Sequence, residues 1–196
     1  MQNKNYSIIY RLMHWAIALC MLALLLTIFL RLTWMNKNHM AEIIKNYLAT
    51  TNQTLTDDQM ILLAKKIRKP MWDWHIYLGY ALVGLYSLRM ALPFFGEMKF
   101  TNPFKDTFNT KQKFQYGLYL VFYACVAVSL ITGLIIELGP KYLKGQMEEI
   151  HELSIYYLLT FIVLHLGGVI MAELTHQQGL VSRIISGKTK SPDELK

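Results

Sequence analysis

The sequence predicts an all-α fold, an integral membrane four-helix bundle in a single domain that covers residues 1–196. Two observations predict it. The chain is 54% hydrophobic with a mean hydropathy of +0.26, which is too apolar for an ordinary soluble domain of this length. Four separate segments are each apolar over about 20 residues, the length that an α-helix needs to cross a bilayer.

The four spans are expected at approximately residues 10–32, 72–94, 112–137 and 149–174. Inside hydrocarbon the backbone must satisfy its own hydrogen bonds, which favours helices. The first span is uncharged from Leu12 to Leu30 and has no small-residue cleavage site after it, so we expect a permanent helix rather than a removable signal peptide. An even number of spans places both termini on the same side of the membrane.

The stretch between the first two spans, insertion 36–71, is too polar to cross a membrane. Apolar residues recur at helical spacing in its first half, which predicts a short amphipathic helix lying on the membrane or against a partner. Thr56 and Gln59 form a capping-box pattern, so a second short helix is expected to begin there. Pro70 is expected to end that helix before the second span.

The other connections are simpler. Residues 93–109 have the composition of a loop, with Thr110 as the expected N-cap of the third span. The tail from Gln177 onward is polar and basic, so we expect it to be loosely ordered. Cys20 and Cys125 lie inside apolar runs, outside any Cys-x-x-Cys-His pattern, and are expected to be buried packing residues.

The net charge of +7 does not indicate nucleic acid as a partner, because the basic residues sit at helix ends and in loops. There they meet lipid head groups or a partner protein. Of the 20 Lys and Arg residues, eleven lie on the side of the termini and nine on the other side, which favours cytoplasmic termini. Against this count, four cations crowd the start of the second span on the side expected to face outward: Lys65, Lys66, Arg68 and Lys69.

Four histidines lie at or inside the spans: His14, His75, His151 and His165. Ionisable side chains in a bilayer are costly and usually functional. His151 and His165 are fourteen residues apart on the fourth span. In one continuous helix this spacing puts both on nearly the same face, within about 40°, and roughly 21 Å apart along the axis.

Topology supplies a partner for each of these two histidines. The first span starts and the fourth ends on the side of the termini, so His14 can meet His165 there. His75 and His151 can meet at the opposite side for the same reason. Two histidine pairs at two depths are what two bis-histidine haems stacked across a membrane require. Any single histidine could instead hydrogen-bond a neighbouring helix, whereas zinc or copper fits such two-histidine sites poorly.

Arg89 lies fourteen residues after His75 and is therefore expected at the inner depth, beside the His14 and His165 pair. A haem propionate there needs a cationic partner, and Arg can bind a carboxylate bidentately. The alternative is an arginine whose side chain reaches the lipid head groups.

These residues resemble the bacterial cytochrome b561 family, which overlaps with the cytochrome b subunits of nickel-iron hydrogenases. His14-Trp15 is similar to a His-Trp pair in that family's first helix. His75, with Gly79 and Arg89 after it, is similar to the second-helix pattern. Glu-Ile-His-Glu around His151, with His165 fourteen residues later, is similar to the fourth-helix pattern, and the resemblance covers nearly all of the chain.

The resemblance implies two haem b groups, quinone as redox substrate, and an iron-ligand role for His14, His75, His151 and His165. Arg89 follows as a propionate contact. Residues 180–187 are similar to the hydrogenase-associated branch, whereas Glu-x-His-Glu is similar to the compact branch, so both subfamilies stay open. Compact members have a shorter connection than insertion 36–71, which either docks an electron donor or acceptor or caps the edge of the outer haem.

We therefore expect a dihaem b-type cytochrome that transfers electrons between a redox partner on the outer face of the bacterial inner membrane and the quinone pool. With imidazole on both axial positions, electron transfer is favoured over oxygen chemistry. One alternative is a self-contained superoxide:quinone oxidoreductase. The other is a haem-bearing membrane anchor subunit of a hydrogenase or dehydrogenase complex, and the sequence leaves open whether the chain is itself an enzyme.

Overall fold

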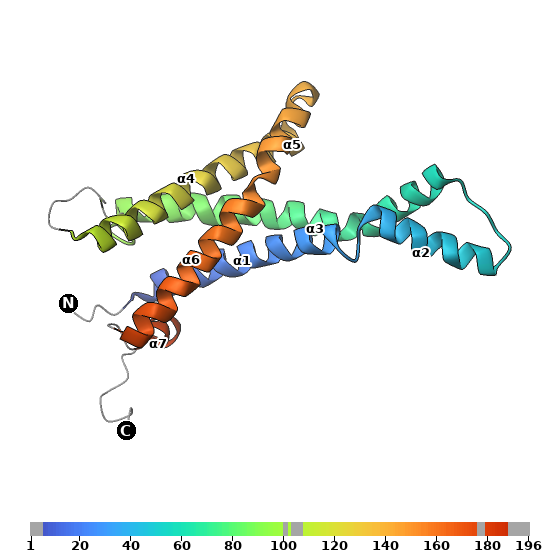
Figure 1. The fold of residues 1–196 in the computed structure, drawn as a ribbon. Helices are drawn as coiled ribbons and strands as arrows, with labels where there is room; N and C mark the ends of the chain where they lie inside the picture. Colours follow the sequence, from blue (N-terminus) through green and yellow to red (C-terminus); the bar gives the residue numbers. More distant parts are fainter. Residues whose placement is uncertain (1–5, 100–101, 103–107, 176–178, 188–196) are drawn as a thin grey trace. The chain divides into compact units, whose positions relative to one another are not determined.

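The computed structural model describes residues 6–99, 102, 108–175 and 179–187 (Figure 1). Its helices, in chain order, are α1 (Ile8–Leu32), α2 (Lys37–Thr50), α3 (Asp57–Ala91), η1 (Leu92–Phe95), α4 (Thr110–Leu138), η2 (Lys141–Leu143), α5 (Lys144–Glu152), α6 (Ser154–Thr175) and α7 (Leu180–Ser186). Within this part of the chain, four stretches are long and apolar enough to cross a membrane: Ile8–Leu32, Asp57–Phe95, Thr110–Leu138 and Lys141–Thr175. The predicted fold class is confirmed.

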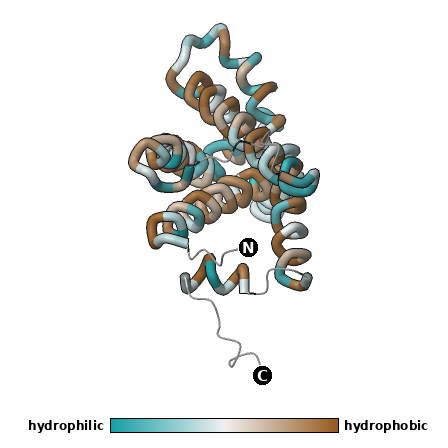
Figure 2. Tube along the Cα trace, turned by 90° about the vertical axis from the view of Figure 1, so that its left-hand side faces the viewer, coloured by the Kyte–Doolittle hydropathy of each residue, from teal (hydrophilic) through white to brown (hydrophobic). Residues whose placement is uncertain are grey.

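The outer surfaces of the long helices are apolar. Brown, hydrophobic positions wind round the turns of the long helices in Figure 2, and large side chains such as Leu26, Leu120 and Val163 are exposed. In water such surfaces would drive aggregation, whereas hydrocarbon accommodates them. These helices are therefore built to be surrounded by lipid.

The chain forms two units, and each is described by itself: the middle unit, residues 17–84, and the terminal unit, residues 1–16 and 85–196. In the middle unit α1 and α3 run antiparallel. Contacts further along α1 are made with residues that come earlier in α3. Cys20 Sγ donates to the carbonyl of Leu78 at 3.3 Å, and further along α1 Thr27 meets His75 at 2.7 Å. Cys20 is buried, as expected, and Cys125 is half-buried.

Insertion 36–71 folds into a helical hairpin of α2 and the first turns of α3. The predicted amphipathic helix is confirmed, since α2 buries Ala41 against Met60 and Ala64 of α3. The capping box at the start of α3 is also confirmed. Thr56 Oγ1 accepts from the Gln59 amide at 3.3 Å, and Gln59 Oε1 accepts from the Thr56 amide at 2.9 Å.

The prediction that Pro70 ends this helix is wrong, because α3 continues unbroken from Asp57 to Ala91. Proline inside a helix removes one hydrogen bond and costs about 3 kcal/mol. Packing on both sides of Pro70 opposes this cost. Ala64 packs against α2 on one side, and on the other Arg31 of α1 lies over the Trp72 ring. Thirty-five residues extend about 52 Å, so α3 reaches beyond the roughly 30 Å of hydrocarbon.

In the terminal unit α4 packs against both α5 and α6. The N-cap of α4 is Asn109, which forms a capping box with Gln112, one residue before the predicted N-cap Thr110. The expected single fourth helix is two helices, α5 and α6, which meet at Leu153 (Figure 1). The fourteen-residue spacing of His151 and His165 therefore crosses a break, and a straight-helix calculation does not hold across it.

Part of the tail that was expected to be loosely ordered is the helix α7, so that prediction is wrong for residues 180–186. Glu173 of α6 accepts hydrogen bonds from the amides of Gly179 and Val181 and so satisfies the start of α7. Trp15 Nε1 donates to the carbonyl of Ile184 at 3.3 Å, and Arg11 donates to the next carbonyl at 3.0 Å. Residues 188–196 lie outside the described part of the chain.

Candidate functional site

The terminal unit brings His14 and His165 together. His14 comes from the first turns of α1 and His165 from the middle of α6. Their ring centroids are 6.1 Å apart and the ring planes are tilted by 45°. Both side chains are half-buried. The two rings are neighbours, and in the described part of the chain no hydrogen bond joins them directly.

Aromatic rings fix His165 in place. The Phe161 ring, one turn earlier on α6, stacks on the imidazole at a centroid distance of 5.5 Å, and Tyr119 of α4 meets it edge-on at 6.3 Å. Nδ1 of His165 is buried and has no hydrogen-bond partner among the residues that the structure describes. A buried polar atom without a partner costs free energy, so this ring is built for a group that the protein itself does not provide.

The separation of these two rings leaves room for one metal ion between them. Imidazole nitrogens bind first-row transition metals at about 2.0–2.1 Å, so two imidazoles on opposite sides of one ion have centroids roughly 6 to 6.5 Å apart. The observed 6.1 Å lies in that range. The described residues contain no cluster of three or more His, Cys, Asp or Glu side chains that could hold a metal ion without further ligands. A metal ion between these two rings would need further ligands from outside the described residues, and a macrocycle would supply them.

His151 is held by α4. Its Nδ1 lies 3.0 Å from the carbonyl oxygen of Ser129 and 3.2 Å from Oγ1 of Thr132. A carbonyl oxygen only accepts, so Nδ1 carries the proton and donates it. The lone pair of the imidazole is then on Nε2, the nitrogen that would bind a metal ion.

Gly133 makes room for this ring. A Cβ atom added there would lie 3.1 Å from Cε1 of His151 and 3.5 Å from Nδ1, so any larger residue would push the imidazole. The glycine therefore serves the position of the histidine side chain. Sequence reasoning had no means of pairing these two residues, which are eighteen positions apart on different helices.

His75 lies in the middle unit and is held by the same kind of bond. Its Nδ1 is 2.7 Å from Oγ1 of Thr27. The Thr27 hydroxyl already donates its one proton to the carbonyl of Leu24 at 2.6 Å, so Oγ1 must accept from the imidazole. His75 thus also carries its proton on Nδ1. The Trp72 ring stacks on the imidazole at 4.6 Å with an interplanar angle of 4°.

The structure thus brings His14 and His165 together, whereas His75 and His151 lie in different units and their pairing stays a prediction. Arg89 is buried in the terminal unit. Its Nε donates to the hydroxyl of Tyr123 at 3.1 Å, and Tyr123 lies one turn along α4 from Tyr119, which contacts His165. The Arg89 side chain is thus held inside the terminal unit, and its role as a propionate contact stays a prediction.

Residues 5–187 match the family described as prokaryotic cytochrome b561. The chain belongs to this family. No curated protein and no solved structure matches the chain.

As a prokaryotic cytochrome b561, the protein is a multi-pass membrane protein that binds b-type haem and acts in electron transport. Its four apolar helices agree with the four-helix membrane bundle of that family. The family match covers α1 to α7, including the hairpin of insertion 36–71.

Sequence reasoning missed the residues that hold the histidines, above all Thr27, Ser129 and Trp72. Thr27 and Ser129 are hydroxyl residues inside otherwise apolar runs. A hydroxyl at such a place can bond its own helix backbone, so it gave no specific signal. Only a three-dimensional contact distinguishes this local role from support of a distant imidazole.

Proposed function

We propose that this cytochrome b561 holds two haem b groups, one between His14 and His165 and one between His75 and His151. It passes electrons between a redox partner on the outer face of the bacterial inner membrane and the quinone pool, with both termini cytoplasmic. The single observation that carries this proposal is the 6.1 Å separation of the His14 and His165 rings, the two residues that would hold the inner haem.

When bound, each haem supplies one-electron transfer between ferric and ferrous iron. The residues of the chain then decide what else is possible. Because two histidines would hold each haem, electron transfer is favoured over the binding of oxygen or substrate. Phe161 and Tyr119 cover the His165 side and keep water away from it. Arg89 supplies a buried positive charge for a propionate carboxylate.

The hydrogen bonds made by Nδ1 differ between the two proposed sites. His75 and His151 each donate from Nδ1 to an oxygen, whereas His165 has no such acceptor in the described residues. An imidazole that donates a hydrogen bond from Nδ1 is a more basic metal ligand through Nε2, and a more basic ligand stabilises ferric iron relative to ferrous iron. The hydrogen bonds of His75 and His151 are therefore expected to lower the potential of the haem that these two residues would hold.

A pyridine haemochrome assay on the purified protein tests the proposal, with two b-type haems expected per chain. One haem, or none, would contradict it. Purification from native membranes then separates the possible cellular roles. Co-purification of an iron-sulfur or c-type cytochrome subunit would identify an anchor of a hydrogenase or dehydrogenase. Quinone reduction by the lone protein with superoxide as donor would identify a self-contained oxidoreductase.

A further inference from the structure

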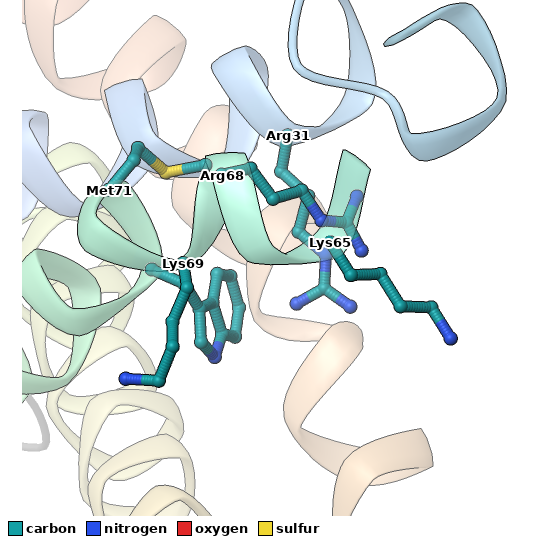
Figure 3. Close-up of a pocket in the computed structure, with 6 residues that line it drawn as sticks. Arg31, Lys65, Arg68, Lys69 and Met71 are labelled. Carbon is teal, nitrogen blue, oxygen red and sulfur yellow. The ribbon is translucent and has the colours of Figure 1, made fainter. Parts of the chain in front are cut away.

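The middle unit carries a cavity of about 230 Å³ between the end of α1 and the middle of α3. Arg31 comes from α1 and the other residues come from α3 (Figure 3). Its lining consists of Arg31, Lys65, Arg68, Lys69, Met71 and Trp72. A second cavity of about 350 Å³ shares three of these cations and adds Leu32, Asn36 and Lys37. No acidic residue lines either cavity.

Two of the cations are held in place by neighbours that do not neutralise them. The Arg31 guanidinium lies 4.0 Å from the centre of the Trp72 ring, and Arg68 donates to the carbonyl of Met35 at 3.4 Å. Lys69 is paired with Asp73 at 2.7 Å. Like charges this close repel one another, and the repulsion grows where apolar surroundings lower the dielectric constant. An anion in the cavity would relieve it.

The depth of the cavity indicates which anion. Arg31 directly follows the uncharged run that ends at Leu30, and Trp72 stands at the start of the second apolar span. Arginine and tryptophan at the ends of spans lie at the level of the lipid head groups. Below this level α1 exposes Leu22, Leu26 and Phe29, a surface on which acyl chains can lie.

We propose that this cavity binds the phosphate-bearing head group of an anionic phospholipid. Guanidinium groups bind phosphate oxygens bidentately, and Arg31 and Arg68 approach from two different helices. The cavity is several times larger than the ~30 Å³ of one water molecule, which suits a head group. The bound lipid would clamp α1 to α3 beside the Thr27 and His75 contact. The site uses only residues of the middle unit and does not depend on the haem assignment.

Native mass spectrometry of the purified, haem-loaded protein tests this site. The protein is equilibrated with mixed micelles of phosphatidylglycerol and phosphatidylcholine, and retained lipids are counted. The wild-type protein should retain phosphatidylglycerol in preference to phosphatidylcholine. In the Arg31→Gln, Arg68→Gln double variant the ratio of the two retained lipids should fall roughly tenfold. The Lys45→Gln, Lys66→Gln variant removes the same charge from the same unit outside both cavities and should keep the preference.

Equal loss in both double variants would overturn the proposal, because it would show attraction by net charge alone. Displacement of the lipid by millimolar inorganic phosphate would also overturn it, because free phosphate and not a lipid head group would then be the ligand of the cavity. If the double variant does not fold, Lys65→Glu serves instead, because this exposed side chain lines both cavities. Haem content is measured in parallel, so failure of the haem assignment is visible separately from loss of lipid.

Discussion

Nδ1 of His75 donates a hydrogen bond to Oγ1 of Thr27 over 2.7 Å, although the two residues are 48 positions apart. The bond ties α1 to α3 inside the middle unit. Because the Thr27 hydroxyl donates to Leu24, the direction of the bond is fixed and the imidazole keeps its proton on Nδ1. The same arrangement recurs at His151, where the acceptor is a backbone carbonyl.

Thr27→Val keeps the shape of the side chain and removes the acceptor for His75. We expect both haems to be retained and one midpoint potential to rise, because an imidazole that no longer donates from Nδ1 is a less basic ligand. The rise should be tens of millivolts, since about 59 mV corresponds to a tenfold change in a one-electron equilibrium. A potentiometric titration followed by absorbance measures this. Thr33→Val is the control, since Thr33 is an exposed hydroxyl of the same unit that bonds only the Phe29 carbonyl. Unchanged potentials in Thr27→Val would show that the bond does not tune a haem.

His165→Ala should remove the inner haem and leave the outer one. The ring lies 6.1 Å from His14, so its loss leaves that iron with one protein ligand. Pyridine haemochrome analysis should give half of the wild-type haem per chain, with one redox transition left. His39→Ala, on the exposed part of α2, should keep the full content. Full haem content in His165→Ala would refute the assignment of this residue.

Gly133→Ala should displace the His151 ring. The added Cβ would lie 3.1 Å from Cε1, closer than ordinary van der Waals contact, so the imidazole must shift by a few tenths of an ångström. We expect a changed low-spin electron paramagnetic resonance signal for one of the two haems. Gly117→Ala on the same helix adds its Cβ to open space and should leave both signals unchanged. Identical effects of the two substitutions would contradict this, because they would show a general change in α4 and not a specific contact with the His151 ring.

Tyr123→Phe removes the hydroxyl that accepts from Arg89 Nε at 3.1 Å. Because Arg89 is buried, loss of this acceptor should lower the free energy of unfolding by about 1–3 kcal/mol. Thermal unfolding in detergent, followed by circular dichroism, measures the difference. Tyr156→Phe changes an exposed tyrosine of α6 and should have little effect. A stability equal to wild type in Tyr123→Phe would mean that another group replaces the hydroxyl.

Much of the architecture was predictable from local sequence. Span length and apolar composition are one-dimensional quantities, and they were enough for the four membrane-crossing helices. The capping box of Thr56 and Gln59 was also predictable, because both partners lie within one turn. The four histidines in apolar runs could also be found from sequence, because an ionisable side chain inside a membrane span is costly in free energy and the span is defined by its neighbours along the chain.

Tertiary structure decided the features that depend on contacts between distant residues. The local rule for Pro70 failed because packing of Ala64 and Trp72 on either side of it keeps α3 continuous. The single fourth helix divides at Leu153, and α7 exists because Glu173 and Trp15 bind its backbone. Sequence by itself determined which residues are apolar, which are ionisable and how they are spaced. It did not determine which oxygen each imidazole meets, because that requires two helices to approach within hydrogen-bond distance.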